Sequence, residues 1–251
     1  MAMPAPGAPL LEGVGDHRRP VTTRSAAAQR YFDQGLSLVY AFNHDEARES
    51  FREAERLDPF CAMASWGVAY ANGPHINYPL VPEDRGREAH DALTRAKAHL
   101  EGARPVERAL VEALATRYAW PAPKDRSALD EAYATAMRKV AAAFPDDADV
   151  AALTAEALMD LHPWDLWTPA GAPQPWTPEI VQRLEAVLAR APNHPLANHL
   201  YIHAVEASPA PGRADAAAQR LRTLQPGLAH MLHMPSHIDV RRGRWEEAIT
   251  A

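Results

Sequence analysis

The sequence predicts an all-α protein, a solenoid built from consecutive helical hairpins. From residue 23 onward, apolar residues recur at intervals of three and four rather than two, which is the period of a helix and not of a strand. Ala, Leu, Arg and Glu, which are good helix formers, dominate over β-branched residues. The 23 prolines among 251 residues favour many short helices over a few long ones.

The expected helices form pairs that are separated by short segments containing Pro, Gly or Asp. In chain order, the predicted pairs cover 24–42 with 44–57, 61–72 with 83–101, 105–119 with 125–143, 147–161 with 178–190, 195–207 with 212–224, and 228–242 with 244 onward. Residues 1–22 are rich in Pro, Ala and Gly and have no helical period, so we expect a disordered arm there. The helical domain is therefore expected over 23–251. We expect it to be truncated at the C-terminus, because the last helix is shorter than its counterparts.

The first helical pair contains a known repeat pattern. Large, small and proline positions follow one another at fixed spacing: Tyr31, Gly35 and Leu38, then Ala47, Phe51 and Ala54, then Asp58 and Pro59. This pattern resembles the tetratricopeptide repeat (TPR), and GRWEEAI near the C-terminus resembles its middle part. The small residues let two helices approach closely, and the proline ends the second helix. The resemblance implies a right-handed superhelix with a concave groove.

The segments HPLANHLYIHAVE and HMPSHI are also similar to those of longer, uncharacterised bacterial TPR-like proteins. That resemblance covers most of the chain and implies the fold but no activity.

Five of the twelve histidines lie in one short stretch, where even scattering would place about two. His199, His203 and Glu206 share one helical face, and so do His230, His233 and His237. The separations from His199 to His233 and from His203 to His237 are both 34 residues, which is the TPR period. We therefore expect these two pairs to face each other. In the TPR family, the corresponding positions line the concave groove.

Two such pairs predict a metal site, because histidines at i and i+4 can direct both imidazoles to one ion. We expect His199, His203, His233 and His237 to converge. His230 and Glu206 lie at the ends of the two stripes and are candidates for supporting groups, a second ion or substrate contacts. Imidazole ligands suit Zn, Cu, Fe or Ni, whereas Ca and Mg prefer oxygen. Glu206 is the candidate catalytic proton acceptor.

Other aromatic and histidine residues are open to two interpretations. The connection that contains His162, Trp164, Trp167 and Trp176 is either a lid or substrate wall, or packing over a repeat junction. Trp66 and Tyr70 are expected to pack between helices, while His75 lies in a loop. His17, His44, His90 and His99 are expected on the arm or the surface.

Composition excludes several classes of function. A net charge of −6 gives no basic surface for nucleic acid, and no apolar run is long enough for a membrane helix. The single cysteine, Cys61, excludes an internal disulfide and favours a reducing compartment, so we expect a cytoplasmic protein.

The sequence contains no phosphate loop, GxSxG or HExxH motif. An enzyme would therefore be a metal-dependent oxidoreductase or hydrolase. The alternative is an interaction scaffold whose groove binds a peptide, a protein helix or a small molecule.

Overall fold

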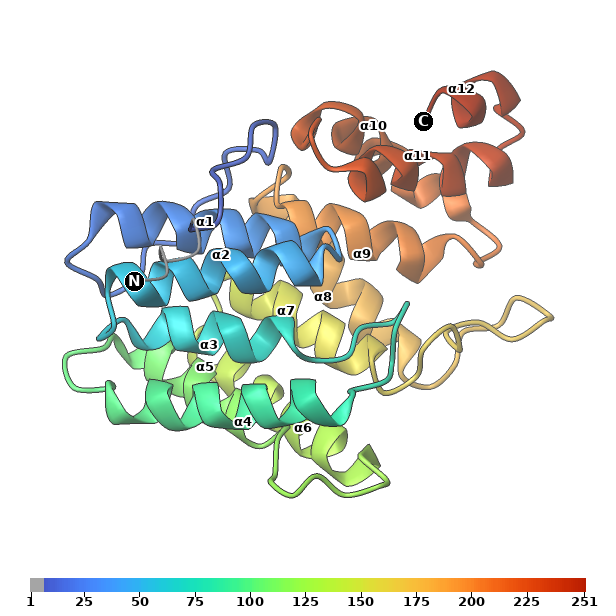
Figure 1. Cartoon of the computed structure of the whole chain (residues 1–251). Helices are drawn as coiled ribbons and strands as arrows, with labels where there is room; N and C mark the ends of the chain where they lie inside the picture. Colours follow the sequence, from blue (N-terminus) through green and yellow to red (C-terminus); the bar gives the residue numbers. More distant parts are fainter. Residues whose placement is uncertain (1–6) are drawn as a thin grey trace.

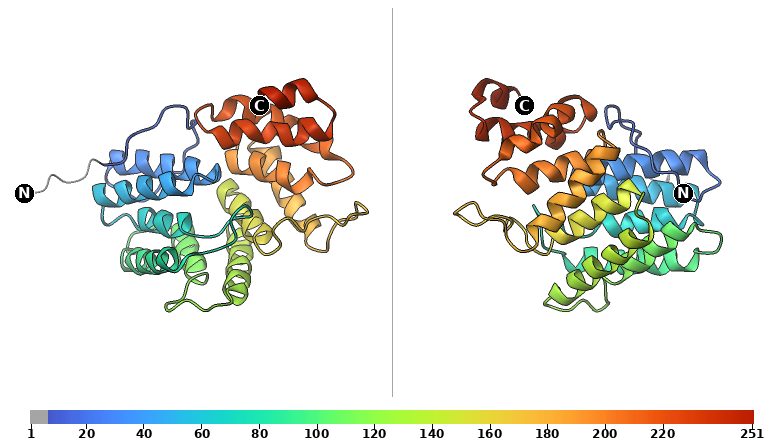
Figure 2. Two further views of the ribbon diagram at one scale, coloured as in Figure 1. Left: turned by 45° about the vertical axis from the view of Figure 1, so that its right-hand side comes forward. Right: turned by 180° about the vertical axis from the view of Figure 1, so that it is seen from behind.

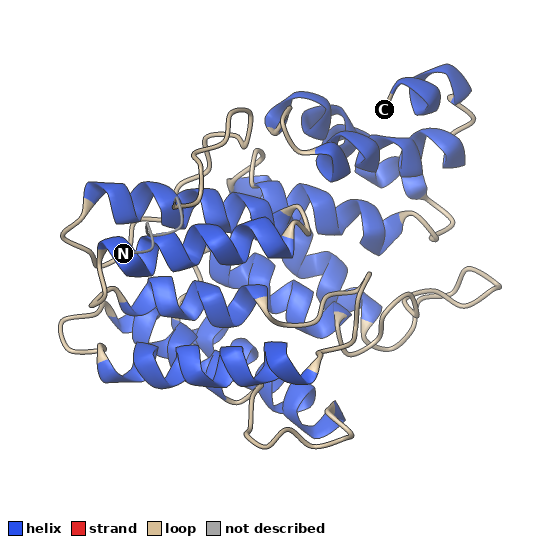
Figure 3. Ribbon diagram, viewed as in Figure 1, coloured by secondary structure: helices blue, strands red, loops and turns tan. Residues whose placement is uncertain are grey.

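The computed structural model describes residues 7–251, and over that range it contains helices and loops but no β-strand (Figures 1 and 3). This confirms the all-α class. Twelve α-helices follow one another in residues 7–251: α1 (Ala26–Tyr40), α2 (His44–Leu57), α3 (Ala62–Ala71), α4 (Glu83–Ala98), α5 (Pro105–Ala115), α6 (Ser127–Ala143), α7 (Ala148–Met159), α8 (Thr177–Arg190), α9 (Pro195–Val205), α10 (Asp215–Leu224), α11 (Ala229–Arg241) and α12 (Trp245–Thr250). Each packs against its neighbour in sequence, as helical hairpins do.

The first hairpin shows how the sequence sets the distance between helices. Gly35 on α1 and Gly67 on α3 both lie against the ring of Phe51 on α2. A Cβ atom would be 2.7 Å from this ring at Gly35 and closer still at Gly67, nearer than packed carbon atoms can come. Phe51 is fully buried between the two glycines. The expected role of small residues in bringing these helices together is confirmed.

Helices alternate between an inner and an outer layer. Every residue of α3 and of α9 is buried, and most of α1 and α7 is buried as well. The even-numbered helix α4, by contrast, buries only a stripe of small and apolar residues, which are Gly86, Ala89, Ala92, Leu93 and Ala96. A helix that is apolar all round must be covered on all sides, whereas a one-sided helix faces solvent. The sequence difference thus assigns each helix to its layer.

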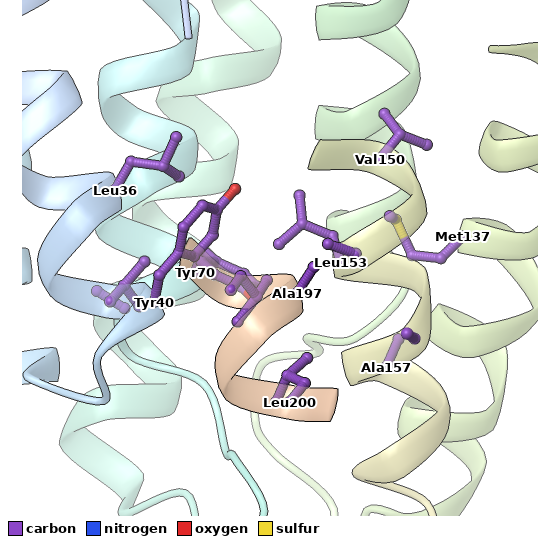
Figure 4. Close-up of a cluster of buried hydrophobic side chains, with 14 of the residues drawn as sticks. Leu36, Tyr40, Tyr70, Met137, Val150, Leu153, Ala157, Ala197 and Leu200 are labelled. Atoms are coloured by element: carbon purple, nitrogen blue, oxygen red, sulfur yellow. The ribbon is translucent and has the colours of Figure 1, made fainter. Parts of the chain in front are cut away.

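The inner helices close on one another across the middle of the molecule. Helix α9 contacts α1 and α7, although α1 lies far from it in sequence (Figures 1 and 2). Leu36 and Tyr40 of α1, Leu153 of α7, and Ala197 and Leu200 of α9 belong to one buried cluster (Figure 4). Side chains therefore occupy the space between these helices, and polar residues on α9 are buried rather than exposed in an open groove.

The N-terminal segment differs from the expected arm. Residues 1–6 lie outside the described range, but residues 7–22 run along the helices and contribute to the core. The side chain of Arg19 is 6% exposed, and its guanidinium lies 2.8 Å from Asp147 and 3.0 Å from Asp149. Val21 is also buried. The segment lacks a helical period because hydrogen bonds and ion pairs, rather than an apolar face, hold it in place.

Candidate metal centre

Helix α9 presents two histidines on one inward face. His194 caps the helix by accepting a hydrogen bond from the Ala197 N–H at 3.2 Å, and Pro195 occupies the first turn. From this start, His199 and His203 lie one turn apart, with ring centroids 5.0 Å from each other. Both side chains are buried. Buried imidazoles in an apolar helix need hydrogen-bond partners, and those partners decide which ring nitrogen remains free.

His199 is oriented by the first helix. Its Nδ1 lies 2.7 Å from the main-chain oxygen of Tyr40, which can only accept, so Nδ1 carries the proton and donates. The Nε2 atom is left with its lone pair and lies 3.0 Å from Nε2 of His230 on α11. The acceptor is 159 residues away in the sequence and belongs to the C-terminal end of α1.

His203 is oriented by a carboxylate at the C-terminal end of its own helix. Its Nδ1 donates to Oε1 of Glu206 at 3.0 Å, while its buried Nε2 has no hydrogen-bond partner among residues 7–251. One ring nitrogen from each of His199, His203 and His230 lies within 4.8 Å of the other two. Two imidazole nitrogens on one tetrahedral ion are about 3.3 Å apart, given metal–nitrogen bonds of about 2.0 Å. The three rings are therefore close enough to share an ion.

Helix α11 meets α9 in a different register from the one that the repeat period predicted. His230, not His233, faces His199, and His237 faces Glu206; both pairs are separated by 31 residues instead of 34. Helix α11 is thus shifted by about one turn relative to the expected arrangement. His233 is displaced outward and contacts the Nε2 of His237 with its own Nε2 at 3.1 Å. The expected convergence of His199, His203, His233 and His237 on one point is not seen.

Glu206 lies between the two helices and binds a histidine from each. Its Oε1 accepts from His203, and its Oε2 accepts from Nδ1 of His237 at 2.7 Å. Burial alone raises the pKa of Glu206, but the hydrogen bonds from His203 and His237 outweigh it and lower the pKa to about 2. Such a weak base with both oxygens occupied is poorly suited to the proton-accepting role that we expected. The geometry makes Glu206 an orienting group.

Burial keeps the imidazoles of the cluster neutral. It lowers the pKa of His199 well below the ordinary value, and the neighbouring His203 and His230 lower it further. Burial also lowers the pKa of His203, and it lowers the pKa of His230 to about 4. Neutral imidazole is the form that binds metals, because a protonated ring has no lone pair to offer.

Three residues that the sequence did not point to complete the surroundings. Phe42 has a φ of 59°, and its ring centroid lies 4.4 Å from that of His199 and 4.3 Å from that of His75. His75 stacks on His44 at 4.3 Å, and burial lowers the pKa of His44 to about 4 and that of His75 to about 3. His44, expected at the surface, is thus part of the inner cluster. No spacing signal links these residues to α9, because the fold alone brings them together.

A second group of ligand-type residues, His17, Asp149 and His194, has a structural explanation. Asp149 Oδ1 accepts from His17 at 2.9 Å, from His194 at 3.2 Å and from the Tyr40 hydroxyl at 2.7 Å, while Oδ2 accepts from Arg19. The other nitrogen of His194 caps α9. Nearly every donor and acceptor is therefore satisfied, and the Arg19 guanidinium already supplies the positive charge. This group holds the N-terminal segment against α7 and α9.

Comparison with family models and with curated proteins identifies no relative of this chain. No protein-family model matches the chain, and no curated protein is significantly similar to it. The likeness to the TPR pattern therefore depends on the residues of the first and last hairpins. Among residues 7–251, no helix is both long enough and apolar enough to cross a membrane.

Proposed function

We propose that this protein binds one transition-metal ion through His199, His203 and His230, and that it is a metal-dependent enzyme, an oxidoreductase or a hydrolase. In this proposal, the site lies between α9 and α11 of a right-handed, TPR-like superhelix, beside the C-terminal end of α1. The absence of multiple cysteines supports a cytoplasmic location.

The hydrogen bonds at Nδ1 are the observation that carries this proposal. Histidines that bind metals almost always donate their other N–H to a carbonyl or a carboxylate, which fixes the tautomer and the ring orientation. His199 does so to the Tyr40 carbonyl, and His203 does so to Glu206. The buried Nε2 of His203 has no hydrogen-bond partner among residues 7–251. A histidine that only fills space in a core has no need to leave this nitrogen unpaired, because a buried nitrogen without a partner costs free energy.

The donor set limits the ion and the chemistry. Three neutral nitrogen donors suit Zn, Cu, Fe or Ni, and they suit Ca and Mg poorly. When bound, such an ion supplies Lewis acidity or electron transfer. The residues of the chain hold the imidazoles neutral and oriented, and Phe42 and Trp164 cover them on two sides, with Trp164 edge-on to His203 at 5.2 Å.

A scaffold that binds a peptide in a concave groove is the alternative, and the geometry supports it less well. A peptide groove needs exposed side chains on the inner helices, as TPR-like grooves have. His199 is 0% and His203 is 5% exposed, and α1 packs against α9 where the groove would open.

Metal analysis of the protein purified without an affinity tag tests the proposal. We expect about one transition ion per folded chain, lost in the His199→Ala/His203→Ala variant because two of the three nitrogen donors are removed. His90→Ala, on the outer helix α4, is the matched control and should keep the ion. His233→Ala should also keep it, since His233 lies outside the group of three. Folded wild-type protein that takes up none of Zn, Cu, Fe or Ni would contradict the proposal.

A further inference from the structure

A small cavity of about 160 Å³ opens beside the histidine cluster. His203 and Glu206 line one side of it, and the connection between α7 and α8 supplies much of the rest. That connection projects from the body of the molecule at the end of the inner helices (Figures 1 and 2). The cavity is therefore the space in which a ligand can reach the proposed metal centre.

Aromatic side chains of His162, Trp164 and Trp167 line the cavity, and Trp164 is 58% exposed at its edge. Trp164 has a φ of 62°, an unfavourable conformation for a bulky residue, and this places its indole edge-on to His203. Trp167 is fixed by a hydrogen bond from its Nε1 to the Ala204 carbonyl at 2.8 Å. His162 stacks on Trp176 with ring centroids 3.6 Å apart. Backbone strain that turns an aromatic ring toward a site is typical of ligand-binding positions.

The size of the cavity suits a ligand with one ring. An engineered apolar cavity of about 150 Å³ holds one benzene molecule. Ile76, Met159 and Leu166 add apolar surface to the aromatic walls. A single six-membered ring thus matches both the volume and the lining.

The charges at the cavity favour an anion. Arg241 lies one turn after His237 on α11, lines the cavity, and forms no ion pair or side-chain hydrogen bond within residues 7–251. Glu206, the only carboxylate among the lining residues, has both oxygens occupied by His203 and His237. The available charge is positive, and guanidinium pairs well with a carboxylate.

We propose that this cavity binds a monocyclic aromatic carboxylate, with its ring between Trp164 and Trp167 and its carboxylate toward Arg241. Such an acid is then the substrate class of the proposed metal centre, and that second statement rests on the proposed function. Binding of the acid itself does not require the ion.

Titration of the metal-free protein with benzoate and with benzylammonium, followed by tryptophan fluorescence and ligand-observed NMR, tests the inference. We expect saturable binding of benzoate and much weaker binding of benzylammonium. Arg241→Gln should weaken benzoate binding by about tenfold or more, since a hydrogen bond to a charged group is lost. Trp164→Ala should weaken both ligands.

Trp120→Ala and Arg242→Gln, which lie outside the cavity, are the matched controls and should bind benzoate as the wild type does. Absence of saturable benzoate binding, or a preference for benzylammonium, would overturn the inference even if the protein holds a metal. Benzoate binding by a protein that takes up no metal would leave the pocket assignment standing and remove the proposed function together with the substrate role.

Discussion

Glu156 on α7 is a buried carboxyl group without a favourable partner. It is 5% exposed, and its side chain forms no ion pair or hydrogen bond within residues 7–251. Burial first, and the neighbouring Asp160 second, raise its pKa well above the ordinary value. A carboxyl whose pKa is raised by folding stabilises the protein below its unfolded pKa, and this stability is lost as the pH rises toward the folded pKa.

Replacing Glu156 with Gln removes this titration while keeping the shape of the side chain. We expect Glu156→Gln to raise the free energy of unfolding relative to wild type, by an amount that grows from pH 5 to pH 8. Urea unfolding at several pH values measures it. Glu131→Gln, on the exposed face of α6, should change stability by no more than about 0.5 kcal/mol at any of these pH values. A constant difference across the pH range would show that Glu156 does not titrate as inferred.

Two residues with a strained backbone lie beside the candidate site. Phe42 and Trp164 are the non-glycine residues with positive φ in the described part of the chain. Both place an aromatic ring near His203, at centroid distances of 6.3 Å and 5.2 Å. Such conformations cost free energy and persist where surrounding contacts hold them. Their shared neighbour is consistent with a site built at that histidine.

Asp149 on α7 holds the N-terminal segment against that helix through its contacts with His17 and Arg19. We expect Asp149→Asn to lower the free energy of unfolding by about 2 kcal/mol, because Arg19 loses one of its two carboxylate partners and keeps only Asp147. Denaturant unfolding measures the loss, and proteolysis near residues 17–22 should accelerate in parallel. Asp146→Asn, at a nearly fully exposed side chain, is the control. A loss below about 1 kcal/mol would mean that the segment is held by other contacts.

Helices were predictable from the sequence, and their mutual register was not. The period of apolar residues and the Pro, Gly and Asp separators identify each helix within a few positions, and Gly35 with Phe51 identifies the first close contact. The sequence also predicted that α9 and α11 lie next to each other. Their register was not predictable, because it depends on how the short 3₁₀ helix Pro211–Ala214 turns the chain before α10, and no periodic signal encodes that turn.

The candidate site was predictable where its residues share a helix. Spacing alone identified His199 and His203 on α9, Glu206 directly after it, and His230 and His237 on α11, although it assigned His233 rather than His230 to the converging set. Phe42, His44 and His75 were not identified, because they reach the cluster from the loop after α1, the start of α2 and the loop after α3. The anchoring role of Arg19 was missed for a related reason, since a buried ion pair leaves no hydrophobic pattern.

For the whole molecule, the proposed ion should act as a stabilising ligand. At a free concentration one hundred times its dissociation constant, it adds about 2.7 kcal/mol to the stability of the folded state. For a chain of this size, the midpoint of thermal unfolding should rise by about 5 to 10 °C. Scanning calorimetry of the apo and the metal-loaded protein measures this rise. Neither Mg²⁺ with the wild type nor Zn²⁺ with His199→Ala/His203→Ala should reproduce it.

The contact between His199 and the main-chain oxygen of Tyr40 has an evolutionary consequence. No amino-acid replacement at position 40 can delete a peptide carbonyl, so point mutation of that partner leaves the tautomer of His199 unchanged. The corresponding partner of His203 is a side chain, and a single codon change can remove it. Natural variation can therefore adjust the basicity of one imidazole while the other stays constant.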